Sequence, residues 1–135
     1  MGSLMRPGSA VLALCVFWAA PLGAEPAIEV VLRCPATASL GRIRCDLEVV
    51  APAGARLSWA DAVLREASPS VTPLRARLAP ADAVEARPER YTWAFAIVAK
   101  ERATVDLALQ VRAVLCRGDG CVPVRADATA RMRVE

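Results

Sequence analysis

Apolar and polar residues alternate along several long segments of the chain, and this period of two limits the fold more than any other feature. The strictest case lies between residues 122 and 134, where every even position is Val, Ala or Met and the odd positions include Arg125, Asp127 and Arg131. The same alternation recurs over residues 28–34, 42–49, 91–97 and 105–115. Successive side chains of a strand point to opposite faces of a sheet, so these segments are predicted to be half-buried strands of an antiparallel sheet protein.

The middle of the chain is harder to assign. Residues 57–67 fit a helix by the spacing of their apolar side chains, and they fit equally a strand interrupted at Asp61, so both structures stay open. Four prolines then punctuate residues 68–89, which predicts loops around one short strand near Leu74 to Leu78. Strands separated by turns at this spacing predict an all-β fold, an immunoglobulin-like antiparallel β-sandwich of about seven strands.

The N-terminal segment has the composition of a secretory signal peptide. Arg6 supplies a positive charge, residues 10–20 form an apolar core too short for a comfortable membrane span, and the small residues of 21–24 are typical of a cleavage region. Removal of residues 1–24, which include Cys15, leaves residues 25–135 as a single β-sandwich domain. The expected location is therefore the periplasm or the outside of the cell.

Four cysteines remain in that domain, an even number that predicts disulfides in an exported protein. Cys34 and Cys45 both fall at inward positions of neighbouring strands, so they are predicted to form a structural disulfide on the core side. Cys116 and Cys121 fall instead at outward positions on either side of a glycine-rich turn at residues 118–120, which would bring them within bridging distance. Solvent is expected to reach both sulfur atoms of this second pair.

An exposed disulfide permits thiol-disulfide exchange, because exchange requires in-line attack of an external thiolate on one of the sulfur atoms. Cys116 and Cys121 are therefore a candidate redox-active pair, in which Arg117 and Arg112 would lower the pKa of the Cys116 thiol. The spacing is equally compatible with a pair that only staples a β-hairpin.

Other chemistry finds little support in the composition. The 135 residues contain no histidine, which excludes Ser-His-Asp and Cys-His catalysis. The cysteines lack the short spacing of zinc knuckles, so neither a metal nor another cofactor is expected. The net charge of +3 is spread along the chain without a basic stripe, so no nucleic-acid partner is predicted, and no small-molecule substrate either. Asp61 with Glu66, and Asp82 with Glu85, are expected to be solvated surface charges rather than catalytic pairs.

One segment resembles a known family. Residues 113–124, with the sequence AVLCRGDGCVPV, resemble the end of the N-terminal periplasmic domain of DsbD-type thiol:disulfide interchange proteins, an immunoglobulin-like domain with a cysteine pair on a hairpin followed by a proline. The resemblance implies a protein-disulfide oxidoreductase component in which Cys116 and Cys121 alternate between dithiol and disulfide. Its expected partners are a membrane-embedded thiol reductase, which supplies electrons, and oxidised periplasmic proteins, which receive them.

Two other functions stay open. The domain would be a non-catalytic binding or structural module if both disulfides serve only to make it rigid. The tripeptide Arg117-Gly118-Asp119 at the predicted hairpin tip matches the integrin-binding sequence, although three such common residues often recur by chance.

Overall fold

A computed structural model describes residues 2–3 and 28–135 of the chain. Segment 4–27, which holds the apolar core of the predicted signal peptide and Cys15, lies outside the described residues. No helix in the described part of the chain has the length and apolar character needed to cross a membrane.

The described residues form ten strands and one short 3-10 helix. Six of the strands are long enough to build the body of the domain, and the other four have two or three residues each. In chain order the elements are β1 (Glu29–Arg33), β2 (Thr37–Ala38), β3 (Gly41–Val50), β4 (Arg56–Ala67), β5 (Val71–Pro73), β6 (Arg77–Leu78), η1 (Pro80–Asp82), β7 (Glu85–Arg87), β8 (Arg90–Ala99), β9 (Ala103–Arg117) and β10 (Gly120–Val134).

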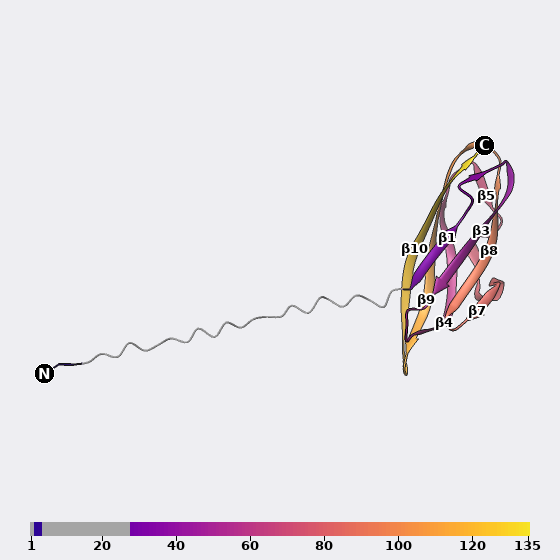
Figure 1. The fold of residues 1–135 in the computed structure, drawn as a ribbon. Coiled ribbons are helices and arrows are strands. Elements are labelled where there is room, and N and C mark those ends of the chain that lie inside the picture. The colour runs from indigo at the N-terminus through magenta and orange to yellow at the C-terminus, as the bar shows by residue number, and fades with distance from the viewer. Residues whose placement is uncertain (1, 4–27) are drawn as a thin grey trace.

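The strands make two sheets that face each other (Figure 1). The first sheet has the order β1-β3-β8-β5, with β7 on the same side of β8 as β5, and the second has the order β2-β10-β9-β4-β6. If β5 and β7 are taken as one interrupted strand, the main strands in chain order follow the A-B-E-D and G-F-C arrangement of immunoglobulin domains. The predicted all-β immunoglobulin-like sandwich is therefore confirmed.

The core lies between the sheets and is filled by the inward positions that the alternation predicts. On β3, β8 and β9 these positions are buried almost throughout, and the largest buried side chain is the indole of Trp93, which donates a hydrogen bond to the carbonyl of Ala79 over 2.9 Å. The inward phase of β10 is also confirmed for Ala128, Met132 and Val134. Val122 is the exception, since it is 47% exposed near the turn of the β9–β10 hairpin, on the outermost long strand of the second sheet.

Strand β4 explains why residues 57–67 fit two patterns. It pairs antiparallel with β9, but the register shifts between Leu57 and Trp59 and again between Leu64 and Glu66. Each shift inserts one extra residue, a β-bulge that moves the inward phase by one position. Inward side chains consequently fall at intervals of both two and three residues, and the longer interval is what imitates a helix.

The prediction of one short strand near Leu74 to Leu78 is confirmed by β6 (Arg77–Leu78), but it is wrong in expecting a single strand. Segment 68–89 holds three short strands and one helical turn, because the chain pairs with β8 as β5, crosses to the second sheet as β6, and returns to β8 as β7. Pairing with strands far away in the sequence sets these elements, so local composition did not reveal them.

Candidate functional site

The candidate redox pair lies at the end of the β9–β10 hairpin. All fifteen residues of β9 pair with the fifteen of β10, from Ala103 opposite Val134 to Arg117 opposite Gly120. The connection is the two-residue turn Gly118-Asp119, in which Gly118 has φ +54° and Asp119 has a negative φ. A glycine with positive φ at the first central position is the arrangement of a type II′ turn, whose twist suits a hairpin.

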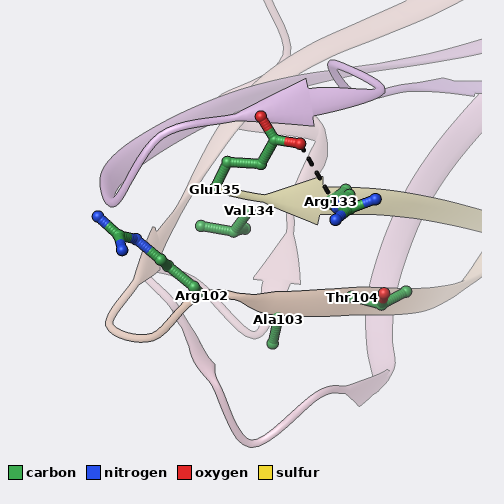
Figure 2. A pocket seen from close by; sticks show the side chains of 6 residues that line it. All are labelled: Arg102, Ala103, Thr104, Arg133, Val134 and Glu135. Carbon is green, nitrogen blue, oxygen red and sulfur yellow. Dashed lines mark ion pairs between the residues drawn. The ribbon is translucent and has the colours of Figure 1, made fainter.

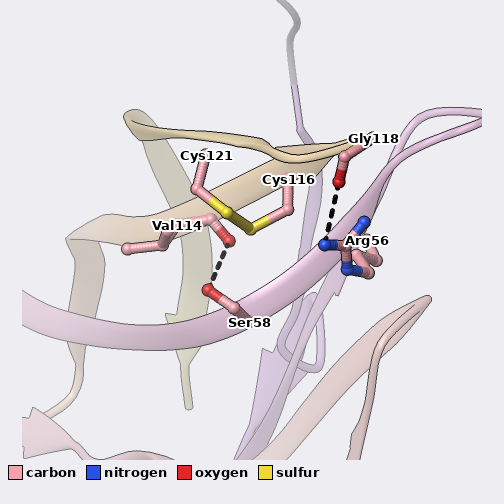
Figure 3. The surroundings of a disulfide bond; sticks show 6 residues. All are labelled: Arg56, Ser58, Val114, Cys116, Gly118 and Cys121. Carbon is pink, nitrogen blue, oxygen red and sulfur yellow. Dashed lines mark hydrogen bonds between the residues drawn. A yellow bond between two sulfur atoms is a disulfide. The ribbon is translucent and has the colours of Figure 1, made fainter.

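Cys116 and Cys121 face each other directly across this hairpin and form a disulfide, with their Cα atoms 4.0 Å apart (Figure 3). Their exposure differs strongly. Cys121 is exposed, whereas Cys116 is only 1% exposed, so the prediction that solvent reaches both sulfur atoms is wrong for Cys116. Strand alternation predicts which way the Cys116 side chain points, but not which neighbouring residues bury it. Cys116 is more buried than Cys121 because β9 lies between β4 and β10 in the sheet, whereas Cys121 is on the outermost long strand.

Arg56 lies beside the disulfide. It pairs with Cys116 across β4 and β9, and its guanidinium donates a hydrogen bond to the carbonyl of Gly118 over 3.1 Å (Figure 3). The two arginines expected near the Cys116 sulfur are turned elsewhere, since Arg117 donates to the carbonyl of Ala53 over 3.2 Å and Arg112 binds a carboxylate. Sequence reasoning missed Arg56, because only the register of β4 against β9 brings it to Cys116.

Cys34 and Cys45 also form a disulfide, with a Cα separation of 4.4 Å. Cys45 is fully buried on the inner face of β3, and Cys34 is half-buried just after β1 and packs against the same part of the core. The core-side position predicted for this pair is confirmed. Two disulfides in one small domain are typical of an oxidising compartment.

Asp61 is the main electrostatic feature of the outer face of the second sheet, and it is completely buried. Its carboxylate accepts hydrogen bonds from Arg112 Nε over 2.8 Å and from Arg77 Nε over 2.9 Å, with a further contact from the Arg112 terminal nitrogen. The Arg112 guanidinium also lies over the ring of Trp59, 5.8 Å from its centroid. The expectation that Asp61 is a solvated surface charge is therefore wrong.

Burial is the largest single influence on Asp61 and raises its pKa, but the hydrogen bonds and charges of Arg112 and Arg77 together outweigh it. The pKa of Asp61 consequently lies below its ordinary value, and the carboxylate is ionised at neutral pH. This arrangement ties β4 to β9 and to β6, the strands that carry the three side chains. Glu66 lies near the end of β4 and is exposed, as expected for a solvated surface charge.

Two hollows on the described surface lie away from both disulfides. One, of about 640 Å³, lies at the far end of the hairpin from the Cys116–Cys121 disulfide, where the Arg133–Glu135 ion pair forms one side and Arg102 lies near the other (Figure 2). Another, of about 340 Å³, lies on the outer face of the first sheet beside Arg42, Arg44 and Arg75. Among residues 2–3 and 28–135, no three Cys, Asp or Glu side chains gather in a group that could hold a metal ion.

Fold and bridges together define the class: an immunoglobulin-like β-sandwich domain with two disulfides. No family model and no curated protein matches the chain. Among solved structures, AggA, the major subunit of aggregative adherence fimbriae type I from Escherichia coli, is similar with a TM-score of 0.42 and 11% identity, over 81% of this chain and 96% of that chain. Murine CRIg is similar with a TM-score of 0.39 and 17% identity, over 79% of this chain and 98% of that chain.

Proposed function

We propose that this protein is a non-catalytic, disulfide-stapled immunoglobulin-like module with a structural or binding role in an oxidising compartment. One observation carries the proposal: the Cys116–Cys121 bridge joins directly opposed residues of a fully paired hairpin, and one of its sulfur-bearing residues is almost completely buried. Burial of Cys116 removes one of the two sulfur atoms that an external thiolate could attack. A bridge in that position serves rigidity better than exchange.

The surroundings of the bridge support the same role. Arg56 and Arg117 each donate a hydrogen bond across the hairpin end, to Gly118 within the turn and to Ala53 in the loop between β3 and β4. The disulfide and these two hydrogen bonds therefore hold the hairpin end in addition to its backbone pairing. A rigid end loses little conformational entropy when a partner binds it, which favours recognition.

Thiol-disulfide exchange of the DsbD type is the second candidate, and the exposure of Cys121 is the observation in its favour. In this function an external thiolate attacks the Cys121 sulfur, forms a mixed disulfide there, and releases Cys116 as a thiolate beside Arg56. A second thiolate then resolves the mixed disulfide, so the hairpin pair gains two electrons and becomes a dithiol. The electrons would come from a membrane-embedded thiol reductase and pass on to oxidised periplasmic proteins.

A redox titration of the purified protein, with thiol alkylation and mass mapping of each pair, separates the two functions. Cys34–Cys45 serves as the internal reference in the same samples, because its core position makes it structural in both cases. The module function predicts that Cys116–Cys121 stays oxidised down to about −300 mV, as structural bridges do. A midpoint in the range of about −270 to −120 mV, where exchange proteins operate, would overturn it in favour of exchange.

A further inference from the structure

Within residues 28–135, strand β10 has no strand partner along most of one of its two edges. β9 pairs with all of one edge, but on the other edge β2 pairs only with Arg133 and Val134. Among the described residues no other strand of the second sheet lies beyond β10, and the neighbour on that side is β1 of the first sheet, which lies close to β10 without pairing with it (Figure 1). Residues 121–131 therefore carry backbone groups on this side that no described strand pairs with, and such an edge is a template for pairing with another strand.

The hydrogen bonds at the end of β10 identify which residues face this edge. The N–H groups of Arg133 and Glu135 donate to the carbonyls of Ala36 and Ala38, so these residues point their backbone groups away from β9. Alternate residues of a strand in an antiparallel ladder point the same way. The odd-numbered residues from Cys121 to Arg131 consequently face the open edge, although Pro123 brings no N–H group.

The side chains of these residues lie on the outer face of the sheet, where Arg125 and Asp127 are neighbours along the open edge and both are exposed. Neither forms an ion pair within the described residues, in contrast to Arg131, which binds Asp106. On β9, the residue opposite Arg125 is Arg112, whose guanidinium forms an ion pair with Asp61, and the residue opposite Asp127 is Gln110. The edge thus carries two opposite charges that the domain itself leaves uncompensated.

We propose that this edge of β10 pairs antiparallel with β10 of a second copy of the chain, with a two-fold axis at Ala126. In that register Arg125 of each copy lies opposite Asp127 of the other, which gives two equivalent ion pairs and joins the second sheets of both copies. A C2 contact uses the same surface on both partners, so the charge pattern has to complement itself, and this one does.

The same charges exclude the neighbouring registers. A shift of two residues one way places Asp127 opposite Asp127 of the second copy, and a shift the other way places Arg125 opposite Arg125. Like charges directly opposite each other across two strands are destabilising. An exposed edge with these charges also repels apolar strands, so it admits a second copy while discouraging unspecific aggregation. The pairing is independent of whether the Cys116–Cys121 bridge exchanges.

Sedimentation equilibrium of the purified chain and of charge-reversed variants tests the contact. Arg125→Asp and Asp127→Arg each place like charges opposite each other and should weaken dimerisation about tenfold or more. The double variant Arg125→Asp with Asp127→Arg restores both ion pairs with reversed direction and should dimerise like the original chain. Arg42→Asp, an exposed position on β3 without an ion pair among the described residues, is the matched control and should leave dimerisation unchanged.

Amide hydrogen exchange of the unmodified chain gives a second readout that does not depend on any variant's folding. The N–H groups of Arg125, Asp127 and Thr129 should exchange more slowly as protein concentration rises, whereas those of Val124 and Ala126, which bond to β9, should not change. A chain that stays monomeric, or a double variant no stronger than the single ones, would overturn the proposal. So would an Arg42→Asp variant that dimerises as poorly as they do.

Discussion

At the scale of single residues, Asp61 is the one charged side chain that is fully buried among the described residues, so its ionised form depends on its two arginines. A carboxylate that is fully buried has lost its water, and it stays ionised only because charged hydrogen bonds replace that water. Removal of the Asp61 charge leaves the positive charges of Arg112 and Arg77 without their carboxylate partner. The energetic value of this network can therefore be measured at one position.

Asp61→Asn should lower the free energy of unfolding by about 2 kcal/mol, the usual range for losing hydrogen bonds to a charged group. Urea denaturation of the oxidised protein measures the loss. Asp106→Asn is the control, since Asp106 and Arg131 form an ion pair of similar geometry whose side chains are 60% and 75% exposed. Solvent screens that pair, so its loss should be much smaller. Equal losses for the two variants would contradict the importance given to the burial of Asp61.

The pH dependence of stability follows from the same carboxylates. The pKa of Asp61 lies below its ordinary value because the arginine hydrogen bonds outweigh burial, and hydrogen bonds from Arg131 and from the Ala79 N–H lower the pKa of Asp106 and Asp82. Each group ionises more readily in the folded chain, so its contribution is fully present above the ordinary value of 3.8 and is lost as pH falls through the lower folded pKa.

Urea denaturation between pH 3 and pH 8 should therefore give a free energy of unfolding that is flat from about pH 5 to pH 8 and falls at more acid pH. The absence of histidine from the sequence removes the side chain that most often titrates within the flat range. In the Asp61→Asn variant the free energy of unfolding should fall less steeply at acid pH. A steep change near neutral pH would show that a group outside this set governs stability.

At the scale of elements, the strands that could be predicted are those whose face is decided by simple alternation. β3, β8 and β9 alternate without interruption, and the inward positions assigned from the sequence are buried apart from Phe95, which is half-buried. β4 was ambiguous because its two bulges change the phase, and bulges depend on the partner strand. For the same reason the exposure of Cys116 could not be predicted, since phase fixes a direction but the neighbouring strands fix what covers it.

The hairpin turn gives a prediction at this scale. Gly118→Ala should cost about 1 kcal/mol or more, because φ +54° is unfavourable for a residue with a Cβ atom. Gly120→Ala is a control two residues away, where an added Cβ would meet only the carbonyl of Arg117 at an ordinary 3.7 Å and φ is not positive. Urea denaturation of both variants compares them, and a larger loss at Gly120 would show that the turn is not of the assigned type.

At the scale of the whole molecule, the two disulfides differ in their relation to the core. Cys45 is fully buried and belongs to the cluster that holds Ile43, Ile97 and Met132 between the sheets, whereas Cys116 and Cys121 lie outside both core clusters. Access to the Cys45 sulfur atom requires the sheets to separate, and Cys34, just after β1, is half-buried, so the fold has to open at least locally before this bridge is reached. Access to the Cys121 sulfur requires no such opening, because this residue is exposed in the folded state.

The rates at which excess dithiothreitol reduces the two disulfides should therefore depend differently on urea concentration. Acid quench, alkylation and mass mapping measure both rates in the same samples. The rate for Cys116–Cys121 should change little with added urea below the unfolding transition, since the attack occurs on the folded protein. The rate for Cys34–Cys45 should rise with urea, because attack on this bridge requires part or all of the fold to open, and its slope is at most the denaturant dependence of global unfolding. Cys116→Ala with Cys121→Ala removes the first process and should leave the urea dependence of the second. If both bridges instead showed the same steep dependence, the hairpin end would open only with the whole domain, and the exposed Cys121 sulfur would not be open to direct attack.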